Sequence, residues 1–110
     1  MTLLPTDTNN NPIPVMRPRP GFSQSVAVTA TSARNATAFD PATRVVGLYA
    51  TVPMFVRLGN SSVVATTTDH YLPADTYMDI SVAGATAQSY SHIAAVRASS
   101  DGTLYLSEKF

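Results

Sequence analysis

Runs in which apolar and polar residues alternate fill most of the chain beyond residue 24. Ser25–Thr31 alternates with a period of two, which places every second residue on one face of a β-strand. Arg44–Thr51 is apolar on both faces, as a central strand is, so we expect it to be the best-buried strand. Within it, Gly47 indicates a bulge or a close approach of another group to the backbone. Pro53 then interrupts the pattern, because proline cannot donate a hydrogen bond to a sheet.

The second half continues this pattern, with turn residues between the runs. Tyr77–Val82 is predicted to point its even-numbered residues, Met78 among them, into a core. Asp101-Gly102 lies between two alternating apolar runs, which predicts that the chain ends in a β-hairpin. The other predicted segments are strands at Met54–Leu58, His70–Leu72, His92–Ala98 and Thr103–Ser107, and a short paired piece at Ala36–Phe39.

These segments predict an all-β protein with almost no helix. Strong helix formers are scarce, since Lys109 and Glu108 are the only Lys and Glu, whereas Val, Thr and Tyr are plentiful. About seven short strands separated by turn signals are typical of a small antiparallel β-sandwich or jelly-roll-like domain. We assign residues 25–110 to that domain.

The first 24 residues have a different composition and predict an extended Pro-rich arm. Proline fixes the backbone and removes a hydrogen-bond donor, so this segment cannot build a core of its own. At about 3.3 Å per residue it spans roughly 70 to 80 Å, far beyond the radius of a folded body of this size. Such an arm either lies on a neighbouring molecule or is a disordered tail. Its predicted partner-binding residues are Pro12, Ile13, Pro14, Val15, Met16, Arg17, Pro18 and Arg19.

The composition narrows the classes of partner. The chain has a formal net charge of zero, which removes the electrostatic attraction that nucleic-acid binding relies on. It contains no Cys, so disulfides and thiolate metal sites are excluded and synthesis in the cytoplasm is expected. Its first residues do not resemble a signal peptide, and no transmembrane segment is predicted. Only 13% of the residues are charged, which suits packing between copies.

The sequence predicts no catalytic, cofactor-binding or metal-binding residues. His70 and His92 lie in different strands, without acidic residues at a metal-binding spacing. Asp69 precedes His70, but neighbouring strand residues point to opposite faces, so Asp69 is interpreted as a turn residue. If Asp75 and Asp79 faced each other near a rim they would resemble a glycosidase pair, yet the chain is too short to build a deep sugar cleft around them, so both are interpreted as solvated loop residues. We therefore expect that the protein is not an enzyme.

The five tyrosines raise an alternative from another class, a carbohydrate-binding module in which aromatic rings stack on sugars. Tyr49 and Tyr105 occur in a core-like alternation, so the sequence leaves Tyr71, Tyr77 and Tyr90 as the surface candidates.

Four short motifs in the second half, taken in order, carry a resemblance to a known group of proteins. They are Val56–Gly59, Ala65–Asp69, Tyr71–Ala74 and Asp101–Glu108. Together they resemble small β-rich virion proteins of tailed bacteriophages over roughly residues 44–108. The arm has no counterpart in this resemblance.

The resemblance implies a structural protein of the virion, made in the host cytoplasm and used in many copies. A capsid decoration or cement protein is the expected role, with the arm bound to the major capsid protein and the β-rich domain displayed. A neck, head-completion or tail component is the alternative. The implied partners are other virion subunits or further copies of this chain, with no direct contact to nucleic acid or membrane.

Overall fold

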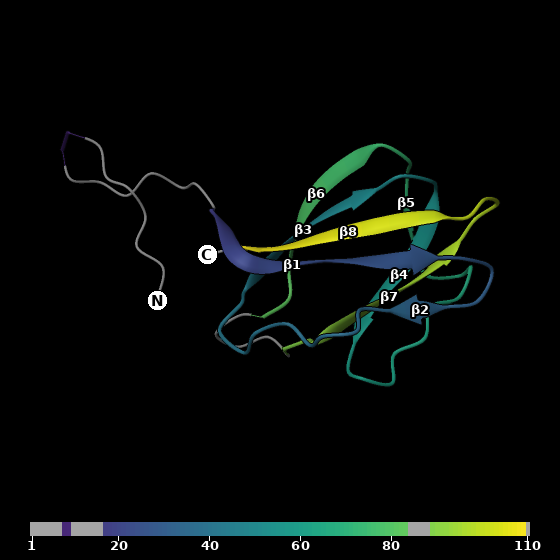
Figure 1. The fold of residues 1–110 in the computed structure, drawn as a ribbon, viewed down its shortest axis with the longest axis horizontal. Helices are drawn as coiled ribbons and strands as arrows, with labels where there is room; N and C mark the ends of the chain where they lie inside the picture. The colour runs from purple at the N-terminus through teal and green to yellow at the C-terminus, as the bar shows by residue number, and fades with distance from the viewer. Residues whose placement is uncertain (1–7, 10–16, 84–88, 110) are drawn as a thin grey trace.

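The computed structural model describes residues 8–9, 17–83 and 89–109, and these residues form β-strands and loops without any helix (Figure 1). The prediction of an all-β protein is confirmed. The described residues form eight strands, compared with about seven predicted. The strands are β1 (Pro18–Val28), β2 (Ala33–Arg34), β3 (Val45–Ala50), β4 (Met54–Gly59), β5 (His70–Leu72), β6 (Thr76–Ser81), β7 (His92–Arg97) and β8 (Gly102–Lys109).

The strands form two antiparallel sheets of four strands each. The first sheet has the order β1-β8-β3-β6 and the second has the order β2-β7-β4-β5. The pairs are nested along the chain, since β1 pairs with β8, β2 with β7, β3 with β6 and β4 with β5. Most partners are therefore far apart in sequence, and the two ends of the described body meet where Pro18 lies opposite Lys109.

One hydrophobic core lies between the two sheets. In β3 and β8 the even-numbered side chains point into it, as the period of two requires. The second sheet closes the core from the other side. The buried residues of this core are Val26, Val28, Phe39, Val46, Leu48, Ala50, Met54, Leu72, Val82, Ile93, Ala95, Leu104 and Leu106.

A second, smaller cluster lies on the outer face of the β2-β7-β4-β5 sheet. The loop between β4 and β5 places Val63 and Ala65 against Ala94 and Val96 of β7, with Phe55 beside them. As a result β7 is buried at five of its six positions, whereas β3 is buried at four of six. The prediction that Arg44–Thr51 would be the best-buried strand is therefore wrong, because this loop covers the second face of β7.

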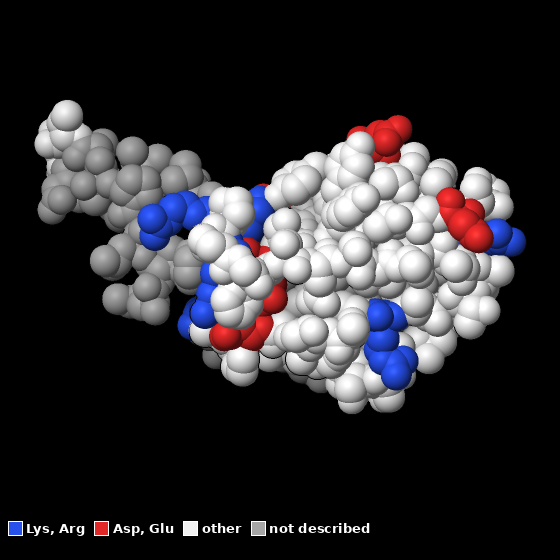
Figure 2. All heavy atoms as spheres, viewed as in Figure 1, with Lys and Arg blue, Asp and Glu red and all other residues white. Residues whose placement is uncertain are grey.

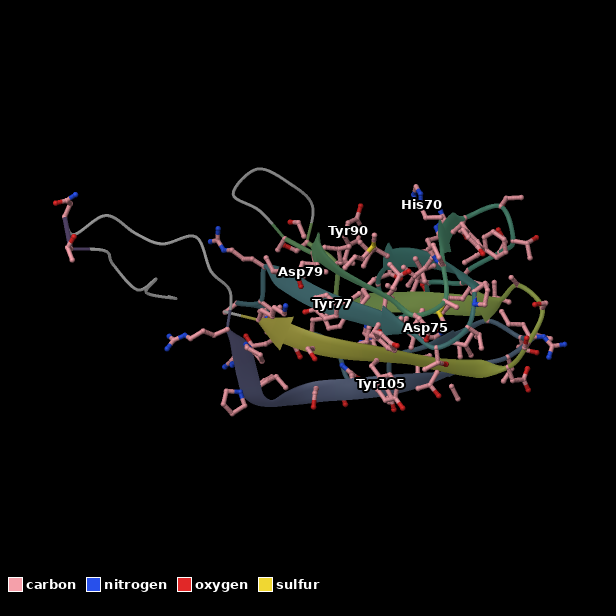
Figure 3. The ribbon with its side chains drawn as sticks, turned by 90° about the horizontal axis from the view of Figure 1, so that it is seen from above. His70, Asp75, Tyr77, Asp79, Tyr90 and Tyr105 are labelled. Atoms are coloured by element: carbon pink, nitrogen blue, oxygen red, sulfur yellow. The ribbon has the colours of Figure 1, made fainter. Side chains whose placement is uncertain are left out.

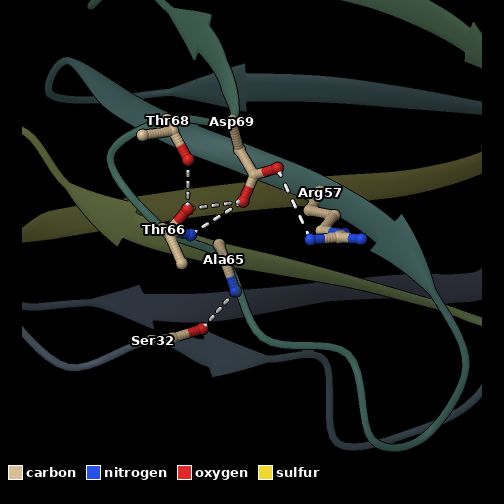
Figure 4. A network of polar contacts seen from close by, with 6 residues as sticks. All are labelled: Ser32, Arg57, Ala65, Thr66, Thr68 and Asp69. Carbon is tan, nitrogen blue, oxygen red and sulfur yellow. Dashed lines mark hydrogen bonds and ion pairs between the residues drawn. The ribbon is translucent and has the colours of Figure 1, made fainter.

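Polar contacts hold that loop in place (Figure 4). The hydroxyl of Ser32 accepts a hydrogen bond from the backbone N–H of Ala65 at 2.9 Å. Asp69 accepts the backbone N–H of Thr66 at 2.8 Å and lies 3.9 Å from Arg57. Asp69 is thus the turn residue that the sequence predicts, since its carboxylate satisfies the backbone of its own loop.

The first strand begins earlier than predicted. Pro18 to Gln24, assigned to the arm from sequence, belong to β1, which continues to Val28. The prolines are tolerated because β1 is an edge strand, where one row of N–H groups needs no partner. The register shifts between Pro18 and Ser23, where Gly21 adopts a φ of 81°. The short paired piece predicted at Ala36–Phe39 lies instead at β2.

The predicted C-terminal hairpin is wrong. β7 and β8 belong to different sheets, so the connection at Asp101-Gly102 crosses from one sheet to the other. Gly102 is explained by packing, since a Cβ atom there would lie 2.8 Å from side-chain atoms of Thr51 and Val52. Arg97 and Asp101 form an ion pair across this connection. The Asp-Gly pattern is local, whereas the choice of partner strand is decided by the rest of the sheet.

A buried carboxylate ties the connection between β2 and β3 to β8. Glu108 is 4% exposed, and its Oε1 accepts the backbone N–H of Asp40 at 2.8 Å and the hydroxyl of Thr43 at 2.6 Å. Asn35 is also buried, and its Oδ1 accepts the N–H of Ile93 at 2.8 Å. Both groups therefore compensate for their burial with hydrogen bonds that fix a loop.

Candidate functional sites: the leader junction and a sheet face bearing tyrosines

The leader, residues 1–17, joins the folded body at the start of β1. Pro18 lies opposite Lys109 in the sheet, so the leader leaves the body at the end where β8 also finishes (Figure 1). Of the eight predicted partner-binding residues, Pro12 to Met16 lie outside the described residues. Arg17 directly precedes β1, and Pro18 and Arg19 are part of that strand.

Arg19 is bound within the body. Its guanidinium lies 3.3 Å from the carboxylate of Asp40 and 3.8 Å from the centre of the Phe22 ring. Both partners belong to this chain, so the positive charge of Arg19 helps to fasten the start of β1. Binding of a partner by Arg19 stays a prediction, and a carboxylate of that partner would have to compete with Asp40.

A second candidate site lies on the outer face of the β1-β8-β3-β6 sheet. Tyr49 of β3 is directly opposite Tyr105 of β8 on one side and Tyr77 of β6 on the other. We call these three residues the tyrosine row. Tyr77 and Tyr105 are 52% and 51% exposed, and Tyr49 between them is half-buried. The prediction that Tyr105 belongs to the core is wrong, and Tyr49 also lies on the outer face.

The sequence contained a signal for this arrangement. Leu104 and Leu106 point into the core, and neighbouring strand residues face opposite ways, so Tyr105 between them has to face outward. The alignment of the three tyrosines depends on the register between strands, which the sequence does not reveal. Met78 was predicted to point inward, but it is 42% exposed because β6 is an edge strand with less cover.

Tyr77 lies over the backbone of Gly47. A Cβ atom at Gly47 would come within 2.9 Å of Cζ of the Tyr77 ring, so glycine makes room for the aromatic side chain. This is the close approach that the sequence predicted at Gly47. The Tyr77 hydroxyl donates a hydrogen bond to Asp79 Oδ1 at 3.0 Å, and Nζ of Lys109 lies 4.6 Å from the ring centre. These contacts hold Tyr77 in one orientation.

Asp75 and Asp79 flank the row, with Tyr77 between them (Figure 3). The Tyr49 hydroxyl donates to Asp75 Oδ1 at 3.1 Å, and Lys109 donates to Asp79 Oδ1 at 2.7 Å. Asp75 lies in the predicted turn before β6 and has a φ of 54°, a left-handed conformation that Asp tolerates better than most residues. Each carboxylate thus positions a tyrosine hydroxyl.

The same contacts shift three pKa values. The hydrogen bond from Lys109 holds the pKa of Asp79 below its usual value, although partial burial opposes this and the Tyr77 hydroxyl adds to it. Burial lowers the pKa of Lys109, but its hydrogen bond to Asp79 and its contact with Tyr77 outweigh burial and the pKa is raised. The hydrogen bond to Asp75 raises the pKa of Tyr49. At neutral pH, Asp79 and Lys109 are therefore both charged and form an ion pair.

The remaining aromatic and histidine candidates lie elsewhere. Tyr71 is 57% exposed on the other sheet, where its ring centre is 5.5 Å from that of Phe55. Tyr90 is half-buried and lines an open hollow of about 420 Å³ beside the β4–β5 loop. His70 is exposed on β5, whereas His92 is buried on β7 with its Nδ1 2.8 Å from the Ser91 hydroxyl.

Within the described residues, no group of three or more His, Cys, Asp or Glu side chains could hold a metal ion. The same residues contain no helix that is both long and apolar enough to span a membrane. Comparisons with known proteins found no matching family model, curated protein or solved structure. The candidate function therefore has to be argued from the residues and the fold of this chain.

Proposed function

We propose that the protein is a structural component of the virion of a tailed bacteriophage, and specifically a capsid decoration or cement protein that attaches through its leader. One observation carries the proposal. Every described member of the core between the sheets lies at or beyond Val26, so the body has a core to which the leader contributes no described residue. In this proposal the leader binds a surface on another molecule.

The strand order also supports a structural role. Eight strands in two sheets with the nested order β1-β8-β3-β6 and β2-β7-β4-β5 match the jelly-roll arrangement, which occurs in viral capsid domains and in lectins. This arrangement refines the expectation of a β-sandwich or jelly roll. A shared fold does not by itself assign a function, so it adds to the resemblance without replacing it.

The surface is suited to crowding on a shell. Charged side chains lie mainly near the rim of the face in Figure 2, and most of the area between them is uncharged. The centres of protein interfaces are depleted of charge, so such a surface allows close contact between copies or with a shell. A homo-oligomer or a multicopy array on the shell is part of the proposal.

The leader is built to dock at a low entropic cost. Its prolines restrict the free chain, so less freedom is lost when it orders on a partner. It enters β1 at a sheet edge, and an extended segment of this kind can add to the edge of a partner's sheet or lie in a groove. Contacts made only with the mature shell would stabilise that shell by mass action.

Deletion of residues 1–16 tests the anchor, because it leaves Pro18 and the whole of β1 in place. The truncated body should keep the melting temperature of the full chain to within a few degrees and should lose binding to purified particles. A matched control is Arg57→Gln in the full chain, which removes the ion pair with Asp69 and keeps both the leader and every predicted partner-binding residue. Particle binding by the truncated protein at the level of the full chain would reject the leader as the anchor.

Electron microscopy of particles labelled with an antibody against the body tests the location. Label distributed over the head supports decoration, whereas label at a single vertex or along the tail supports the neck, head-completion or tail alternative. If purified virions carry neither the label nor any fragment of the protein, the virion assignment is overturned.

A further inference from the structure

The outer faces of the two sheets differ in how far they are covered. The β4–β5 loop covers the outer face of the second sheet, whereas the tyrosine row on the first sheet is exposed. The proposed leader contact does not use this row. We propose that the tyrosine row is a binding site for a neutral polysaccharide, whose sugar rings stack on Tyr105, Tyr49 and Tyr77.

The spacing of the row suits a linear chain of sugars. Tyr105, Tyr49 and Tyr77 occupy three adjacent strands at the same register position. Adjacent strands are about 4.8 Å apart, so the three side chains extend over about 10 Å, which is of the order of two linked sugar rings. Tyrosine combines an apolar ring face with a polar hydroxyl, and the C–H faces of a pyranose pack against such a ring.

The carboxylates beside the row supply acceptors for sugar hydroxyls. Asp75 and Asp79 accept the hydroxyls of Tyr49 and Tyr77 through Oδ1. A carboxylate accepts about four hydrogen bonds, so both groups keep capacity for a ligand. The side chain of Asp79 is 42% exposed even while it pairs with Lys109. Tyr49 and Tyr77 are held by these hydrogen bonds with acceptors alongside, and such preorganisation lowers the entropic cost of binding.

The charge of this face favours a neutral ligand. Asp75 and Asp79 carry two negative charges close to the row, and Lys109 supplies one positive charge, so the local balance is negative. An anionic polymer would be repelled, which disfavours nucleic acids and acidic polysaccharides. The neighbouring outward residues on β1 and β8 are small and mostly hydroxylated, and they add further hydrogen-bonding groups. They are Ser23, Ser25, Ala27, Thr103 and Ser107.

The shape of the face favours an extended ligand. The two hollows described in the structure are lined by residues of the second sheet and its loops, such as Arg57 and His92. The tyrosine row lines neither hollow. Because small molecules usually bind in concave sites, a line of aromatic rings outside both hollows fits a polymer better.

Affinity electrophoresis of the full chain tests this inference. Native gels contain hydroxyethylcellulose, galactomannan or dextran as neutral polysaccharides, or polygalacturonate as an anionic one. We expect at least one neutral polysaccharide to retard the protein. Tyr77→Ala and Tyr105→Ala should each weaken that binding by about 2- to 10-fold, the range expected for one aromatic stacking contact. Tyr71→Ala is the matched control, because Tyr71 is equally exposed but lies on the other sheet.

Each outcome decides the question. Selective loss of retardation in the Tyr77 and Tyr105 variants, with unchanged melting temperatures, supports the site. Failure of all three neutral polysaccharides to retard the protein would overturn it, as would retardation by polygalacturonate alone or an equal effect of Tyr71→Ala. Sedimentation in which the wild type self-associates and Tyr105→Ala is monomeric would reassign the row to an interface between copies. None of these results depends on the role of the leader in particle binding.

Discussion

The outer faces of the two sheets differ in a way that separates stability from binding. On the β2-β7-β4-β5 sheet, small apolar residues such as Ala94 are covered by the β4–β5 loop and form a second cluster. On the β1-β8-β3-β6 sheet, the equivalent outward positions carry the tyrosine row, in which Tyr77 and Tyr105 are exposed and carboxylates accept the hydroxyls of Tyr49 and Tyr77. A covered face contributes to the core, whereas aromatic rings left exposed in fixed orientations indicate a binding surface.

The largest loss of stability is expected when a buried apolar residue of a strand is replaced by a charged one. Leu106→Asp places a carboxylate without a partner in the core, where Leu106 is 1% exposed. The cost should exceed about 4 kcal/mol, which is a large share of the roughly 5 to 15 kcal/mol that stabilises a typical domain. Circular dichroism during thermal melting measures this. The neighbouring Tyr105→Asp should cost less than about 1 kcal/mol, and equal losses in both variants would show that the assigned facing of β8 is wrong.

An intermediate loss of stability is expected when the contact between the β4–β5 loop and the second sheet is weakened. Val63→Ala removes two methyl groups from the cluster with Ala94 and Val96 and should cost about 1 to 3 kcal/mol in urea denaturation. Val64→Ala is the matched control, since Val64 is 55% exposed and its replacement should stay within about 0.5 kcal/mol. If both variants keep wild-type stability, the loop does not act as a cover.

A smaller effect on stability, but a clear one on the tyrosine row, is expected from Gly47→Ala. The new methyl group would displace the end of the Tyr77 side chain, which is flexible enough to move. The free energy of unfolding should change by less than about 1 kcal/mol, because alanine also restricts the unfolded chain. Near-ultraviolet circular dichroism should report the reoriented tyrosine. An unchanged spectrum, together with unchanged polysaccharide binding, would contradict the contact between Gly47 and Tyr77.

The smallest effect is expected from protonating Asp79. Its pKa is lower in the folded protein than in the unfolded chain, so its ion pair stabilises the fold above the unfolded pKa. This contribution is lost as the pH falls through the folded pKa. Asp79→Asn should therefore melt slightly below the wild type at pH 6, and the difference should shrink as the pH falls through the folded pKa. Because Asp79 is largely solvated, a large difference at pH 6 would contradict this account.

The local pattern predicts strands well and their partners poorly. The pattern correctly predicts strands at Met54–Leu58 and His70–Leu72, and Pro53 correctly separates two strands. The Asp101-Gly102 signal wrongly predicts a hairpin, since β7 and β8 belong to different sheets. A turn motif depends only on the residues beside it. In the nested arrangement, by contrast, paired strands can lie as far apart in sequence as the first strand and the last.

By itself, the sequence determined that this protein is all-β, that its leader differs from its body, and which short segments form strands. These properties depend on the period of two, on proline and on turn residues, all of which act over a few positions. Only the tertiary structure decided that Pro18 already belongs to the sheet and that Tyr49, Tyr77 and Tyr105 lie side by side. Register between distant strands is set by the packing of the whole core, so a site composed from three strands emerges only when that core has formed.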